Sequence, residues 1–171
     1  MARDRYHRFS KESCEELTLV AGIGVLGDAH AGTLVQHRSR QQREPNQENL
    51  RQVHLIHTEL LAELAGQGYD VAPGDLGENI TTTGVPLLDL PVDTRLRLDQ
   101  VVVRLTGLRN PCRQIEDFRP GLLQHVVGRE GGRTVRRAGV MAVVEVGGEV
   151  RPGQGIEVEV PAGPHQPLEP V

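Results

Sequence analysis

The chain has 171 residues, enough for one domain with a substantial hydrophobic core. Its formal net charge of −4 gives no reason to expect nucleic acid or an acidic membrane surface as a partner, and two Tyr, two Phe and no Trp offer little for stacking on single strands. Because no signal peptide and no apolar run of membrane-spanning length are present, we expect a cytoplasmic protein whose thiols stay reduced.

Residues 1–16 are polar and charged, and they are expected to be partly irregular. Lys11 is the one lysine of the chain, and taken alone it is expected to be solvated, although it could reach a site. Cys14 is followed by two glutamates, which oppose formation of a thiolate, so Cys14 is expected to be inert.

A short apolar strand at residues 17–20 leads into a glycine-rich loop, residues 21–32. The glycines lack the spacing of a dinucleotide-binding motif and no long helix follows, so a Rossmann fold is rejected. Four polar residues project from this region: Asp28, His30, His37 and Arg38. The acid and the two histidines could bind a metal, but their loose spacing favours polar recognition of a ligand over zinc.

Residues 50–56 alternate as a strand, and residues 59–65 carry one apolar stripe of leucines, which predicts a short helix with Thr58 as its N-cap. His54 and His57 are assigned structural roles. A second glycine loop begins at residue 73 with a turn and carries Asp75, Glu78 and Asn79 before a threonine-rich strand. A general acid or base could lie in this loop, although self-capping turn residues are the simpler explanation.

A hairpin is predicted for residues 94–98 and 101–108, with leucines on one face and arginines on the other. The strand ends at a corner where Asn110 suits the N-cap of a helix over residues 112–118 and Pro111 suits its first position.

Cys112 then lies in the first turn of this helix, flanked by Arg109 and Arg113. The helix dipole and both arginines favour a thiolate, the form that attacks electrophiles and binds metals. A small buried core residue is the alternative. The spacing of residues around Cys112 leaves both interpretations, thiolate and core residue, open. The two arginines favour the thiolate, because a core cysteine does not need them.

Residues 120–127 predict a second short helix, and residues 128–132 predict a loop. Arg133, Arg136 and Arg137 then form a basic cluster, either a solvated face or a site for an anion.

A buried strand over residues 138–146 is expected to turn back at two glycines and pair with residues 149–151. Residues 156–160 predict the last strand, and residues 161–171, with four prolines, predict an extended tail.

Short strands outnumber helices, which predicts a mostly β fold over residues 17–160: an antiparallel β-barrel with a few short α-helices packed on it. If the two glycine loops and the Cys112 corner meet at one end of this barrel, they form a pocket for an anionic small molecule.

Three motifs carry a family resemblance: GDAHAG and QHR within residues 27–38, GDLGENITTTG at residues 74–84, and TGLRNPC ending at Cys112. Together they resemble the MOSC domain family, the C-terminal domain of molybdenum-cofactor sulfurases, and the likeness is strongest to standalone bacterial members. The resemblance covers roughly residues 7–160 and implies a β-barrel that binds the molybdenum cofactor, a pterin dithiolene with a phosphate.

The resemblance implies that Cys112 ligates molybdenum or carries a persulfide. Residues expected to hold the cofactor are Lys11, His37, Arg38, Asn79, Thr81, Arg109 and Asn110. Protons would come from Asp28, His30 or Glu78 during reduction of an N-hydroxylated substrate.

Such a reductase needs a separate electron donor, because no flavin or iron–sulfur motif is visible. The alternatives are sulfur transfer from a donor protein, a module that binds the cofactor without turnover, and a structural barrel without a ligand. The oligomeric state and the substrate are not predicted.

Overall fold

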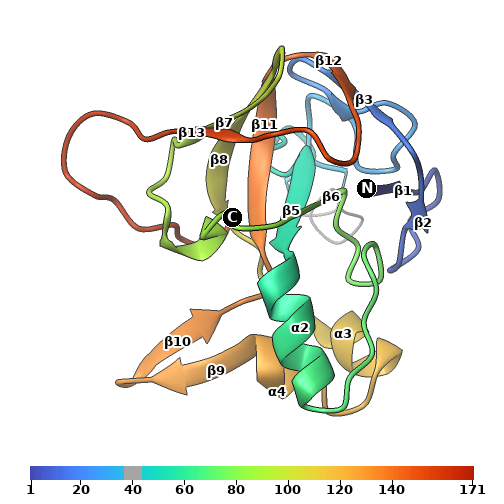
Figure 1. Cartoon of the computed structure of the whole chain (residues 1–171), viewed down its shortest axis with the longest axis vertical. Coiled ribbons are helices and arrows are strands. Elements are labelled where there is room, and N and C mark those ends of the chain that lie inside the picture. Colours follow the sequence, from blue (N-terminus) through green and yellow to red (C-terminus); the bar gives the residue numbers. More distant parts are fainter. Residues whose placement is uncertain (37–43) are drawn as a thin grey trace.

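The computed structural model describes residues 1–36 and 44–171. Its main sheet curls around a core (Figure 1) and has six strands in the order β13 (Glu157–Glu159), β7 (Arg95–Leu98), β8 (Val101–Leu108), β11 (Val140–Val146), β5 (Val53–His57) and β6 (Ile80–Thr82). Every neighbouring pair is antiparallel except β5 and β6. The predicted mostly β, barrel-like fold with few helices is therefore confirmed.

A second sheet of three strands, in the order β12 (Gly148–Val150), β3 (Leu17–Val20) and β4 (Gly24–Val25), covers one end of the first. The predicted pairing of residues 149–151 with the preceding strand is wrong, because β12 pairs with β3 instead. Only Gly147 separates β11 from β12, and one residue is too short for a hairpin turn. The chain therefore crosses to the other sheet.

The predicted hairpin β7–β8 is confirmed, with Asp99 and Gln100 at its turn. Its inward leucines and valines join those of β3, β5 and β11 in one core cluster, and Leu168 from the C-terminal tail completes that cluster. The backbone N–H of Leu108 donates to Glu169, so the proline-rich tail packs along β8. A filled interior of this kind gives a rigid support for loops at the sheet ends.

Helices α2 (Thr58–Gly66), α3 (Arg113–Phe118) and α4 (Leu123–Val126) gather below the barrel (Figure 1). They pack around a second apolar cluster that includes Leu60, Ile115 and Leu122. The predicted N-cap is wrong, because His57 is the cap residue and the Thr58 hydroxyl bonds Thr83 instead. None of these helices, the longest in the described part of the chain being nine residues, could cross a membrane.

The loop predicted at residues 128–132 is instead the turn of a hairpin, β9 (Val127–Glu130) and β10 (Arg133–Arg136). Gly131 and Gly132 both have positive φ, 55° and 81°, which a two-residue hairpin turn of this hand requires. The helix predicted for residues 120–127 is shorter in the structure, where it is α4. Val127, the last residue of the predicted helix, already has an extended backbone.

The N-terminal segment begins with β1 (Ala2–Arg3), which pairs with β2 (Glu12–Ser13). The N–H of Ala2 donates to the carbonyl of Asn79, and the N–H of Lys11 donates to Gly74. These contacts hold the intervening irregular residues against the second glycine loop. A short 3-10 helix, η1 (Leu87–Asp89), follows β6.

Candidate functional site

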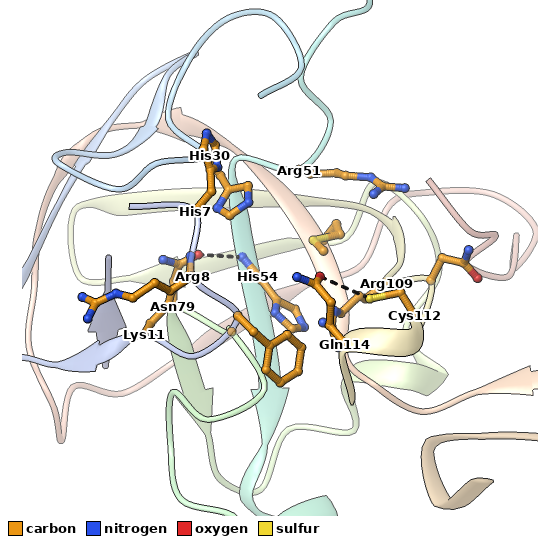
Figure 2. A pocket seen from close by; sticks show the side chains of 14 residues that line it. His7, Arg8, Lys11, His30, Arg51, His54, Asn79, Arg109, Cys112 and Gln114 are labelled. Atoms are coloured by element: carbon orange, nitrogen blue, oxygen red, sulfur yellow. Dashed lines mark hydrogen bonds between the residues drawn. The ribbon is translucent and has the colours of Figure 1, made fainter. Parts of the chain in front are cut away.

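A cavity of about 470 Å³ lies where the N-terminal segment, both glycine loops, β5 and the β8–α3 corner meet. Figure 2 shows the labelled side chains arranged around this shared space, with His54, Asn79 and Cys112 contributed by different segments of the chain. Six predicted site residues line it: Lys11, His30, Asn79, Arg109, Asn110 and Cys112. Sequence reasoning did not assign the other eight to a site: His7, Arg8, Phe9, Arg51, His54, Gly77, Gln114 and Met141.

The thiol of Cys112 is exposed at the cavity, and its Sγ donates to the Gln114 side-chain oxygen at 3.4 Å. The predicted cap is wrong, because Cys112 itself is the N-cap residue of α3 and Asn110 and Pro111 precede the helix. The N–H of Arg109 donates to Gly139, which keeps this segment against β11 and delays the helix start.

The two arginines that flank Cys112 have different surroundings. The Arg113 side chain is 90% exposed, pairs with Asp117 and does not line the cavity. Arg109 lines the cavity near the Phe9 ring, and its Nη1 is buried without a hydrogen-bond partner among the residues described. Burial lowers the pKa of Arg109, opposed by Cys112 and Glu78. A buried guanidinium nitrogen without a partner is a natural donor to an anionic ligand.

Asp28 lies behind the cavity wall, where its carboxylate accepts hydrogen bonds from three lining residues. The distances to the carboxylate oxygens are 2.7 Å from Lys11 Nζ, 3.0 Å from Asn79 Nδ2 and 2.9 Å from the backbone nitrogen of His30. Burial opposes the charge, but the hydrogen bond with His30 and the charge of Lys11 outweigh burial and lower the pKa of Asp28. Asp28 thus orients its three partners as a fixed negative charge.

Lys11 is not solvated, contrary to the expectation from its position alone. Its side chain is 4% exposed and pairs with Asp28. Burial lowers the pKa of Lys11, and the charge of Asp28 opposes that shift.

Glu78 is fully buried. Its neighbour Gly77 lines the cavity, and Glu78 does not. Its Oε1 accepts hydrogen bonds from the Gly74 N–H and the Thr81 hydroxyl, and its Oε2 has no partner in the described chain. Burial raises the pKa of Glu78, opposed by the bond from Gly74. Neither Glu78 nor Thr81 reaches the cavity, and predicted residues His37 and Arg38 lie outside the described residues.

His54 combines the structural role predicted for it with a place in the cavity wall. Its Nε2 lies 2.8 Å from the carbonyl of Ala138, and its backbone N–H donates to Asn79. Burial, followed by the charge of Arg109, holds the pKa of His54 well below its usual value. Because a carbonyl only accepts, Nε2 is the donor in the hydrogen bond between the His54 ring and Ala138.

The lining residues, as far as the chain is described, include four cationic side chains and no carboxylate: Arg8, Lys11, Arg51 and Arg109. Arg8 is itself held by Asp4 and Glu12, each 2.6 Å away. No group of three or more potential metal-ligating side chains occurs in the described ranges, so the zinc alternative gains no support there. Arg8 and Lys11 are thus already paired with carboxylates behind the wall, and the unpartnered nitrogen of Arg109 is the group that suits an anionic small molecule.

Comparison with known proteins tests the family resemblance. The family model described as the MOSC domain matches residues 30–157. The chain belongs to the MOSC domain family. This MOSC chain has the same fold as the YUAD protein from Bacillus subtilis, with a TM-score of 0.73 and 24% identity over 92% of this chain and 91% of that one.

YiiM from Escherichia coli shares the fold at a TM-score of 0.58 and 17% identity, over 91% of this chain and 67% of YiiM. Identities this low establish the common fold and no more. No curated protein matches the MOSC chain.

Proposed function

We propose that this MOSC protein binds the molybdenum cofactor in the Cys112 cavity and reduces N-hydroxylated compounds there. One observation carries the proposal: an exposed thiol and a buried guanidinium nitrogen without a partner share a cavity whose described lining contains no carboxylate. A soft thiol ligand and anion donors are the two kinds of group that a metal on a phosphorylated organic cofactor requires.

The residues present fit this cofactor. Cys112 would supply the one protein ligand to molybdenum, consistent with a cavity that has no multi-residue metal cluster in its described part. Arg109 and Lys11 would hold the anionic groups, and Asn79 and Asn110 would bind polar edges of the pterin. The cavity volume of about 470 Å³ falls within the usual range for small-molecule sites. When bound, the cofactor supplies two-electron redox chemistry.

The protein's own contribution is to orient groups and move a proton. Asp28 stays ionised, so it accepts the hydrogen of His30 Nδ1 at 3.2 Å and fixes that tautomer. Nε2 of His30 is then the ring atom that takes up and releases a proton for the substrate. Of the three predicted proton donors, His30 is the one that lines the cavity.

The test is the molybdenum and pterin content of protein made in a host that synthesises the cofactor. Wild type should carry stoichiometric molybdenum, and Cys112→Ala should lose most of it. Cys14→Ala is the matched control, because Cys14 is partly buried against the core and does not line the cavity. Equal molybdenum content in wild type and Cys112→Ala would refute the assignment of Cys112.

Sulfur carriage is a second candidate, favoured by the exposure of Cys112. Its thiolate would attack the outer sulfur of a donor protein's persulfide; the donor S–S bond breaks, the donor thiolate leaves, and Cys112 gains one sulfur. Mass spectrometry of wild type after incubation with a persulfide donor should then show one added sulfur that is absent from Cys112→Ala. Molybdenum-free protein that gains this sulfur would favour carriage over reduction.

A further inference from the structure

The stretch of the chain that contains Cys112 and continues to the end of the β9–β10 hairpin has a charge opposite to that of the rest of the chain. Residues 109–137 contain seven arginines and three acidic residues, a net charge of +4 in a chain of net charge −4. The remaining residues therefore carry −8. The site described above uses only Arg109 from this set, so six arginines remain unexplained. They belong to the part of the chain that forms α3, α4 and the β9–β10 hairpin (Figure 1).

One face of the hairpin contacts the rim of the cavity through Arg136. Its register and the alternation of side chains place Arg129 and Arg136 on one face and Arg133 on the other. Nε of Arg136 donates to Oδ1 of Asn110 at 2.9 Å, and Asn110 lines the cavity two residues before Cys112. Arg136 therefore connects this face of the hairpin, which also carries Arg129, to the rim that holds the thiol.

Arg129 is available to a partner. Within the described ranges no carboxylate pairs with Arg129 or Arg136, whereas Arg137 pairs with Glu130. Arg129 is exposed, and the hairpin projects from the helices beside α4 (Figure 1). An exposed guanidinium without an internal counter-ion binds and steers an approaching acidic surface.

We propose that the hairpin face of Arg129 and Arg136 docks an acidic electron-carrier protein beside the Cys112 cavity. The inference rests on the proposed function: reduction of N–OH to N–H and water consumes two electrons and two protons, and a carrier protein would supply the electrons. A long nucleic acid is a poorer match, because the residues outside this stretch carry a net charge of −8.

The first test is binding, which requires neither cofactor nor turnover. The probes are an acidic [2Fe–2S] ferredoxin and a flavodoxin, titrated into the full chain by calorimetry at several salt concentrations. For at least one carrier we expect a Kd that rises with salt concentration. In Arg129→Glu the Kd should be about tenfold higher than in the wild type. Arg133→Glu is the matched control, the same charge reversal on the opposite face of the same hairpin, and should change Kd less than about twofold.

Three binding results would overturn the docking face. The first is an equal loss of carrier affinity in Arg129→Glu and Arg133→Glu. The second is that neither carrier binds the wild type. The third is that duplex DNA binds in place of a carrier and that Arg129→Glu abolishes this DNA binding.

The second test separates this inference from the proposed function. Reduced methyl viologen is a small cationic donor that needs no acidic docking surface. In cofactor-loaded protein, Arg129→Glu should keep viologen-driven turnover and lose about tenfold in ferredoxin- or flavodoxin-driven kcat/KM. No turnover with any donor would refute the reductase, and the binding experiment would still decide the docking face. Equal loss with both donors would overturn a docking role for Arg129.

Discussion

The two glycine-rich loops each bury one carboxylate near the cavity, and the two carboxyls behave in opposite ways. Asp28 meets Lys11, His30 and Asn79, which lower its pKa against the effect of burial. Glu78 meets mainly the Gly74 N–H and the Thr81 hydroxyl, which do not offset burial, so its pKa is raised. The proton affinity of a buried acid is therefore decided by its partners, and not by its loop.

The difference separates two roles that loop composition alone assigns alike. Asp28 is a permanent charge that orients the lysine, histidine and amide of the cavity wall. Glu78 keeps its proton to higher pH, and its carboxyl accepts the backbone N–H of Gly74 in the adjoining turn. Four substitutions test this contrast, taken in order of expected effect.

Asp28→Asn should cost the most, about 3–5 kcal/mol of unfolding free energy, because it leaves the Lys11 ammonium buried without a counter-charge. Urea unfolding measures the loss, and Asp70→Asn, an exposed carboxyl, is the control. Adding Lys11→Met to Asp28→Asn should restore part of the stability. A cost below about 1 kcal/mol would mean that this ion pair does not hold the wall together.

Asn79→Ala should cost about 2 kcal/mol, because the Asn79 amide connects the two regions. It donates to Asp28 and accepts from the His54 N–H, and both groups are buried. In a double-mutant cycle with Asp28→Asn the two losses should be less than additive. Full additivity would show that the amide stabilises the fold independently of Asp28.

Glu78→Gln should change stability by less than about 1 kcal/mol in acid, because the amide still accepts from the Gly74 N–H. The wild type should lose stability as pH rises from about 4.5 through the raised folded-state pKa, since the folded state holds the proton more tightly in that window. The Gln variant should lack this loss. Asp28 acts in the opposite direction: its contribution is present above the unfolded-state pKa and falls away on acidification. Denaturant midpoints across the pH range measure both.

Thr81→Val should have the smallest effect on the pH profile and cost about 0.5–1 kcal/mol, because it removes one hydrogen bond of 3.3 Å to Glu78. The loss of that bond should also raise the pKa of Glu78 further, so the pH-dependent fall in stability should extend to higher pH. An unchanged profile would show that Thr81 does not influence this carboxyl.

Much of the local structure was predictable because its cause lies within a few residues. Alternating leucines and arginines predict the β7–β8 hairpin, and Pro73 and Gly74 predict a turn, which the structure contains. Predictions based on capping preference failed at Thr58 and Asn110: each helix has another cap residue, the Thr58 hydroxyl bonds Thr83, and the backbone before Asn110 is bonded to Gly139. The missed His54 and Arg51 gave no local signal, since each acquires its place from strands and loops distant in sequence.

By itself, the sequence determined the fold class, the family motifs and the place of Cys112 at the corner between β8 and α3, because composition, turn residues and alternation act over short distances. Only the tertiary structure decided that Lys11 pairs with Asp28, that β12 joins β3, and that Arg109 alone of the two arginines beside Cys112 enters the cavity. Those outcomes depend on which groups share a buried volume after the chain closes. Burial and pairing across many residues set charge and pKa there, and no local pattern encodes them.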